Sequence, residues 1–252
     1  MEFETLTVTV EEGIGRLTLN QPQNLNPLGT NTLREIREAT EWFDQQGTQV
    51  VIISGEGRSF SAGFDLREFA NANQNGGNGA TLGKQMADAI ENMEAVAIAA
   101  VHGHCVGGGV VLVGACDLRI AATETTFSIP EVDLGIPLAW GGIPRLVREI
   151  GPAMTKELVM TCRPFSAEEA KSIGFLNRVV ALEELEQEAT DLAISIKSRP
   201  HSIIKMTKLQ VHSATEDLAS TQKSWIGEIL ISALEQDKEA KEAAQKYLKR
   251  KN

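Results

Sequence analysis

Apolar and polar residues alternate along the first twenty positions of the chain and then change to a helical period. Residues 5–10 and 14–19 alternate around a turn at Gly13, which predicts a β-hairpin. Positions suited to a buried helix face follow at Leu33, Ile36, Thr40 and Phe43. The apolar run 50–53 then has the length and composition of a buried strand.

The same succession of strand and helix continues through the middle of the chain. The pattern predicts a helix at 82–93, a strand at 95–101, a helix that reaches Val113 and a strand at 117–121. Strands that alternate with helices pair in parallel, so we expect a layered α/β core.

Two later regions have a different character. Residues 71–79 are polar and rich in glycine, which predicts a mobile loop, and strand signals fade after Gly151 and Pro152. Ser166 and Glu169 have the spacing of a capping box, ahead of a short helix that ends at Gly174. We expect helices beyond about Leu182, and divide the chain into a core at 1–185 and a C-terminal helical region at 186–252.

The composition narrows the class of protein. In 252 residues, 42% hydrophobic and 23% charged residues are typical of a folded chain. No apolar run approaches the ~20 residues that span a bilayer, and the N-terminus lacks the basic start of a signal peptide, so we expect a cytoplasmic protein without membrane contacts. The net charge of −10 argues against nucleic-acid binding, and the three cysteines lack the spacing of a zinc or redox site.

A glycine run and a later acidic residue are the strongest candidates for chemistry. Gly107, Gly108 and Gly109 follow an apolar run and can start a helix with its N–H groups exposed, which suits a developing negative charge. Glu131 comes about twenty residues later, after Pro130, and can carry a proton. A second glycine-punctuated loop at 55–66 can supply another backbone N–H to the same oxygen, which would form an oxyanion hole. Plain turns after strands remain the alternative for both loops.

Five segments, in this order, resemble the signature of the crotonase, or enoyl-CoA hydratase/isomerase, superfamily: 61–66 (SAGFDL), 97–109, 130–135 (PEVDLG), 140–146 (WGGIPRL) and 165–170 (FSAEEA). The resemblance runs nearly end to end. It implies the crotonase spiral of β/α repeats with a C-terminal helical region, and an acyl-CoA ligand whose thioester oxygen lies between the N–H groups of Phe64 and Gly108. No separate cofactor is implied, because coenzyme A is part of the substrate.

The resemblance also implies contacts around that oxygen. The adenine is expected against the 61–66 loop, the CoA phosphates near basic residues of the tail, and the helical tail at the contacts of a homotrimer or homohexamer. The implied substrate and CoA residues are Asn24, Ser61, Ala62, Gly63, Asp65, Leu66, Gly107, Val111, Pro130, Ala139, Trp140, Arg250 and Lys251.

Three positions depart from the family pattern. Ala139 and Trp140 replace smaller or glycine residues that are common in hydratases, which would narrow the cleft for water or the acyl chain, and the third position concerns the catalytic glutamates. Hydratases of this family carry two glutamates that hold and activate a water, whereas the first of these positions is Val111 here. Valine cannot hold a water or accept a proton. A single Glu131 can still take a proton from C2 and return it at C4, the logic of the Δ3,Δ2-enoyl-CoA isomerases. Apolar neighbours such as Ile129, Val111 and Trp140 are expected to raise the pKa of Glu131.

Several alternatives stay open at this point. Slow hydration, a non-catalytic acyl-CoA-binding protein and another enolate reaction are the competing functions, while acidic residues that dienoyl-CoA isomerases add are replaced by Val111 and Ala139. Asp65 is interpreted as a brace for its loop, and Glu131 could instead begin an exposed helix. His102 and His104 could share a strand face, but no third ligand has usable spacing, so no metal is expected.

Overall fold

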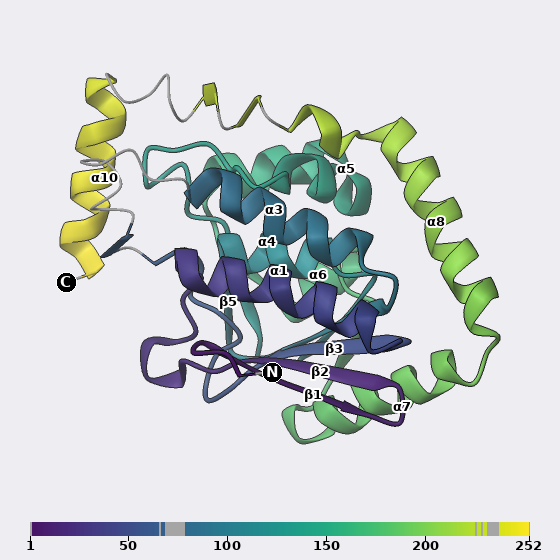
Figure 1. Ribbon diagram of the computed structural model, residues 1–252. Coiled ribbons are helices and arrows are strands. Elements are labelled where there is room, and N and C mark those ends of the chain that lie inside the picture. The colour runs from purple at the N-terminus through teal and green to yellow at the C-terminus, as the bar shows by residue number, and fades with distance from the viewer. Residues whose placement is uncertain are drawn as a thin grey trace.

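The computed structural model describes residues 2–65, 67–68, 79–224, 226–227, 229–230 and 237–251. Their framework is a six-stranded sheet in the order β1-β2-β3-β4-β6-β9, seen nearly edge-on in Figure 1. Its strands are β1 (Leu6–Glu11), β2 (Ile14–Leu19), β3 (Val50–Gly55), β4 (Val96–Val101), β6 (Leu118–Ala122) and β9 (Arg178–Val180). Only β1 and β2 are antiparallel, and every later neighbour in this sheet is parallel.

The alternation in the sequence explains both faces of this sheet. Val51 and Ile53 of β3 enter one apolar cluster, and Val50 and Ile52 enter another on the opposite face. Side chains of a strand alternate between faces, so an unbroken apolar run is the expected composition of a strand covered on both sides. The predicted hairpin and the predicted strand at 50–53 are therefore confirmed.

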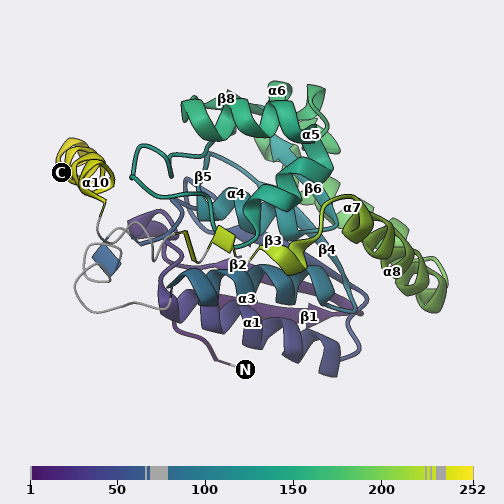
Figure 2. The same cartoon turned by 90° about the horizontal axis from the view of Figure 1, so that it is seen from above.

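Helices cover the two faces unequally. The first cluster joins the sheet to α1 (Thr30–Gln45), α3 (Gly79–Asn92), α4 (Gly108–Ala115) and α5 (Gly142–Thr161). The second face is covered by α7 (Leu185–Lys197), whose Leu185, Ala189 and Ala193 pack on the strands. Figures 1 and 2 show α1 and α3 side by side above the sheet, with α7 on its other side. The helices predicted near 33–43, 82–93 and up to Val113 are confirmed.

A second, smaller sheet lies beside the first and carries the glycine run. It consists of β5 (His104–Val106), β7 (Thr126–Ser128) and β8 (Phe165–Ser166), in that order. The Phe127 and Phe165 rings stack across it with centroids 5.3 Å apart. Gly107 follows β5 directly and α4 begins at Gly108, so the glycine run continues from the small sheet and not from β4 as the apolar run 95–101 suggested.

Two strands follow Gly151 and Pro152, although the strand signals in the sequence fade there. Both β8 and β9 come later, with α6 (Ala167–Ser172) between them. These strands contain two and three residues, and each includes an exposed polar side chain, Ser166 or Arg178. So short a segment shows no measurable alternation of apolar and polar residues. It becomes a strand by pairing with a neighbouring strand.

The remaining elements are helical, and helices follow Leu182 as expected. They are the short 3-10 turns η1 (Pro22–Asn24), η2 (Leu182–Glu184) and η3 (Thr221–Lys223), with α8 (His201–Leu218) and α10 (Lys238–Lys251). Figures 1 and 2 place α8 and α10 on opposite sides of the core. Because α7 packs on the main sheet, the division at 185/186 is not marked by a gap in the core, and it stays a prediction. Within the described ranges, no helix is both long enough and apolar enough to cross a membrane.

Loss of the α6 cap tests the local folding signal. The Ser166 hydroxyl accepts a hydrogen bond from the Glu169 N–H at 3.2 Å, as the capping-box spacing predicts. We expect Ser166→Ala to lower the free energy of unfolding by about 1 kcal/mol, measured by urea denaturation. Ser195→Ala, on the exposed surface of α7, is the control and should change this free energy by less than about half as much.

Candidate active site

The 61–64 loop lies against β5, and this contact brings the two glycine-bearing segments together. The Ser61 N–H donates to the carbonyl oxygen of His104 at 3.1 Å, and the Val106 N–H donates to the Ser61 carbonyl at 3.0 Å. The Ser61 side chain is fully buried, donates to the Asn26 carbonyl at 2.8 Å and accepts from the Gly63 N–H at 3.1 Å. Three segments that are distant in sequence are thereby fixed at one place.

Glycine is required where these segments meet. Gly63 has a φ of 83°, and a Cβ on it would lie 2.5 Å from the Val106 carbonyl oxygen and 3.4 Å from the Gly108 nitrogen. Phe64 follows Gly63, and Gly108 is the first residue of α4, where helix N–H groups lack intrahelical partners. Among the hydrogen bonds of the described residues, neither the Phe64 nor the Gly108 N–H donates to a protein acceptor. Two backbone N–H groups without a protein acceptor thus belong to neighbouring segments, as an oxyanion hole would require.

Glu131 is buried beside this pair of donors. It is 8% exposed, and a Cβ on Gly107 would lie 2.6 Å from its Oε1. Its Oε2 has no hydrogen-bond partner in the described structure. Burial raises the pKa of Glu131 from 4.5 to about 7, opposed only by a hydrogen bond from its own backbone N–H. The predicted rise in this pKa is confirmed.

A tight turn positions Glu131, so the alternative of an exposed helix start is wrong for this residue. The N–H groups of Leu134 and Ile136 both donate to the Glu131 carbonyl at 3.0 Å. Gly135, with a φ of 71°, has its Cα against the backbone of Ala240 in α10. The turn is therefore held from outside by the C-terminal helix. Tyr247 of the same helix has a raised pKa, caused first by burial and then by the charge of Glu131.

Val111 occupies the core next to the site. It is 2% exposed on α4, and a Cβ on Gly142 would lie 2.8 Å from its Cγ2. The pKa of Glu131 is shifted by burial and by its own backbone N–H, and the charge of another carboxylate is not among the causes. The buried carboxylate therefore lacks an acidic neighbour strong enough to alter its proton affinity.

Two aromatic rings stand over the donors. The Phe64 and Trp140 rings meet edge to face, with centroids 5.8 Å apart and an angle of 88° between their planes. Both rings lie against glycines of α3, since a Cβ on Gly79 would lie 2.8 Å from the Phe64 Cζ, and one on Gly83 would overlap the Trp140 indole. A two-glycine face of α3 thus makes room for these rings.

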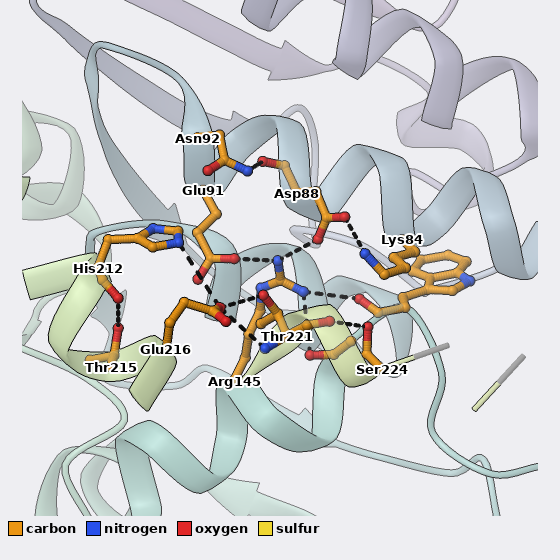
Figure 3. Close-up of polar contacts among 12 residues, drawn as sticks. Lys84, Asp88, Glu91, Asn92, Arg145, His212, Thr215, Glu216, Thr221 and Ser224 are labelled. Atoms are coloured by element: carbon orange, nitrogen blue, oxygen red, sulfur yellow. Dashed lines mark hydrogen bonds and ion pairs between the residues drawn. The ribbon is translucent and has the colours of Figure 1, made fainter. Parts of the chain in front are cut away.

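An ion-pair network centred on the buried Arg145 contacts the main chain of Trp140, and Figure 3 shows Arg145 with its partners Asp88 and Glu91. The Arg145 side chain donates to the carbonyl oxygens of Trp140 and Gly141 at 3.1 and 3.3 Å, and it pairs with Asp88 at 2.9 Å and with Glu91. Figure 3 shows this cluster continuing to His212 and Glu216 of α8 and to Thr221 and Ser224. Arg148 connects the α3 and α8 parts of this network, because it pairs with Glu91 at 2.6 Å and with Glu216.

The other predicted site residues fall into three groups. Asn24 is exposed on η1, Ala62, Pro130 and Ala139 are half-buried, and Asp65 accepts from the Arg67 N–H at 2.8 Å, as expected of a brace. Leu66 and most of the predicted loop at 71–79 lie outside the described residues. Arg250 and Lys251 belong to α10, but their side chains lie outside the described part of the structure. The assignment of these residues to a substrate or CoA site stays a prediction.

His102 does not point toward a metal site. Its Nε2 lies 2.8 Å from the Gly57 carbonyl oxygen, and His104 is exposed on β5. No group of three or more His, Cys, Asp or Glu residues within the described ranges is arranged to hold a metal ion.

Sequence reasoning missed the residues that hold Phe64 and Trp140 in place, namely Gly79, Gly83 and Arg145. Gly79 and Gly83 are four residues apart, a spacing that puts them on one helix face, but their use became visible only from the rings they contact. Arg145 lies in the 140–146 segment of the resemblance, but its supporting role was missed because its partners come from α3 and from the residues just before α5.

Comparisons with known proteins decide the family of this fold and site. The family model described as enoyl-CoA hydratase/isomerase matches residues 9–252. The chain belongs to the enoyl-CoA hydratase/isomerase family. It is 38% identical over 211 residues to crotonyl-CoA hydratase of Syntrophomonas wolfei, covering 82% of this chain and 81% of that protein. It is 36% identical over 225 residues to the probable enoyl-CoA hydratase echA8 of Mycobacterium bovis, covering 87% and 86%.

The fold agrees with solved structures of the family. The crystal structure of an enoyl-CoA hydratase/isomerase from Xanthobacter autotrophicus Py2 superposes with a TM-score of 0.82 at 29% identity, covering 96% of this chain and 89% of that one. The resemblance to the crotonase superfamily and the expected crotonase-type α/β fold are confirmed. The protein is an enzyme of the enoyl-CoA hydratase/isomerase family.

The raised pKa of Glu131 makes stability depend on pH. Between about pH 4.5 and 7 the folded chain holds a proton that the unfolded chain has released, so the free energy of unfolding falls as pH rises. We expect Glu131→Gln to be increasingly more stable than the parent across this range, with a difference on the order of 3 kcal/mol near pH 7 and a small one at pH 4.

Urea denaturation at a series of pH values measures this difference. Glu183→Gln, at an exposed position of η2, is the control and should track the parent at every pH. A Glu131→Gln difference that stays constant with pH would show that Glu131 does not carry the raised pKa.

Proposed function

We propose that the enzyme moves the double bond of an enoyl-CoA thioester from C3 to C2, with Glu131 as its single acid and base. Glu131 takes a proton from C2, the electrons delocalise onto the thioester oxygen, and the same carboxyl returns the proton at C4. The N–H groups of Phe64 and Gly108 stabilise the negative oxygen of the intermediate. No water enters the product, so one proton carrier is sufficient.

The observation that carries this proposal is the isolated, buried carboxylate. A pKa of about 7 lets Glu131 act as a base and then as an acid near neutral pH. Hydration requires a second group to orient and activate water, and the position two residues beyond Gly109 holds Val111 at 2% exposure. The site thus favours the return of a proton over the addition of water.

Hydration is the second candidate, and the relatives are the reason. The proteins from Syntrophomonas wolfei and Mycobacterium bovis are named as hydratases, at 38% and 36% identity. A hydratase built on this chain would need a water held by Glu131 and by a group other than a carboxylate at position 111.

The surroundings of the site fit further parts of this proposal. An acyl-CoA substrate accounts for two backbone donors beside a buried base, and the 61–66 loop with the α10 tail would hold its CoA portion. We also infer a homotrimer or homohexamer in the cytoplasm. Self-association, without its number of copies, is supported by α8, which leaves Ile203, Met206, Leu209, Val211 and Leu218 more than half exposed. Such a face of one chain can be buried against a second copy.

Removal of the base tests the central claim. We expect Glu131→Gln, which preserves shape and cannot ionise, to lower kcat/KM for 3-enoyl-CoA isomerisation by about a hundredfold or more. In the parent, kcat/KM should rise with pH toward a plateau above about pH 7, where Glu131 is ionised in the free enzyme. Absorbance of the conjugated product gives the rates.

Asp133→Asn is the matched control, because Asp133 is exposed and only two residues away. It should retain the rate and the pH profile. Activity of Glu131→Gln within tenfold of the parent would remove Glu131 from the mechanism.

Restoration of a second carboxylate tests the role of Val111. We expect Val111→Glu to raise the hydration rate of a trans-2-enoyl-CoA by about tenfold or more, and to destabilise the fold by a few kcal/mol because a carboxyl enters the core. Mass spectrometry of the product detects the added water. Val111→Gln has nearly the same shape without a base and should not gain hydration. A folded Val111→Glu variant with unchanged hydration would show that Val111 is not what limits it.

A further inference from the structure

The Trp140 indole fills the space between α3 and α4 beside the oxyanion donors. It is 8% exposed, and a Cβ on Gly83 would overlap the fused bond of its two rings. On the opposite side, a Cβ on Gly108 would lie 2.8 Å from Cη2. The ring therefore occupies volume that is open because neither glycine has a side chain. Both helices pack closely against it.

The main chain of Trp140 is also fixed. Its φ of 58° is unusual for a bulky residue and costs about 1–3 kcal/mol unless the surroundings enforce it. Arg145 enforces it here, because one guanidinium nitrogen donates to the carbonyls of both Trp140 and Gly141 and the other nitrogen is held by Asp88 and Glu91. The network thus fixes the main chain of Trp140, and the close approach of Gly83 and Gly108 confines the indole itself.

The Trp140 indole borders the place where the proposed oxyanion donors would hold the thioester oxygen. Gly108 supplies one proposed oxyanion donor, and Phe64, which supplies the other, meets the indole edge to face at 5.8 Å. Acyl carbons beyond C4 must leave a point that is enclosed by the 61–64 loop, by the buried Glu131 and by this ring. The side toward α3, where a long chain could otherwise pass between two glycine-lined helices, is filled by Trp140.

We propose that Trp140 determines chain-length specificity and restricts the enzyme to short-chain enoyl-CoA thioesters. This inference rests on the proposed function in that it uses the same oxyanion donors and the same base. It does not depend on whether the bound enoyl group is isomerised or hydrated.

The first experiment compares hexenoyl-CoA and decenoyl-CoA with the parent, Trp140→Ala and Trp140→Leu. We expect the parent to favour hexenoyl-CoA in kcat/KM by about tenfold or more, and the two variants to reduce this preference by about tenfold by opening space for the longer chain. Trp42→Phe, on α1, controls for the loss of a tryptophan and should keep the parent's preference. An equal rate with both substrates in the parent, or an unchanged preference in a folded Trp140 variant, would overturn the proposal.

The second experiment moves the ring without removing it. The Gly83→Ala methyl overlaps the indole, so we expect the variant to lose about tenfold in kcat/KM for hexenoyl-CoA, while Gly114→Ala, whose Cβ has neighbours only at 3.9 Å, should lose little. In a Trp140→Ala background, Gly83→Ala should have no further effect, because the ring it displaces is absent. A Gly83→Ala defect of the same size in both backgrounds would mean that Trp140 does not limit the acyl chain.

Binding separates this inference from the proposed reaction. Calorimetry with hexanoyl-CoA and decanoyl-CoA needs no turnover, and the parent should bind the shorter thioester more tightly while Trp140→Ala loses that preference. If this result appears with hydration and without double-bond migration, the proposed reaction fails and the chain-length assignment stands. If migration occurs with equal binding of both thioesters, the assignment fails and the proposed reaction stands.

Discussion

The pairing of the 61–64 loop with β5 is the contact on which the site depends. Two hydrogen bonds through Ser61 bring the loop against β5, and the absence of a side chain at Gly63 lets the backbones approach closely. The result is a pair of free N–H groups whose positions are set by main chain alone. Such donors need no reorganisation when charge develops, which is the condition under which hydrogen bonds stabilise a transition state most effectively.

Glu131 shows how one physical effect serves two purposes. Burial removes water from the carboxyl group, which raises its proton affinity and at the same time opposes folding above pH 4.5. The fold tolerates this because the surrounding turn satisfies its own backbone and α10 packs on it from outside. The Oε2 atom without a partner is therefore consistent with a group kept free for a substrate proton.

Much of the fold followed from the sequence, but the supports of the site did not. Apolar period and glycine position predicted the hairpin, the parallel strands, α1, α3, α4 and the α6 cap, because these depend on neighbours within a few residues. The strands β8 and β9 were missed since two or three residues carry no period. Arg145 and the α3 glycines were missed for a related reason, because their meaning comes from partners that are distant along the chain. The motif resemblance supplied the residues of the site, Trp140 included, whereas the contacts that confine its ring and the ion-pair network that supports its main chain became visible only in the structure.

The use of main-chain donors has an evolutionary consequence. Since every residue has a backbone N–H except proline, ordinary substitutions at Phe64 change the ring there and leave the donor in place. On the proposed mechanism, the reaction can therefore diverge through side chains while the oxyanion donors are retained. On the proposed mechanism, the difference between returning a proton and adding water lies largely at position 111. Two of the four valine codons become glutamate codons by a single base change, so the two proposed chemistries can be one substitution apart with the backbone donors unchanged.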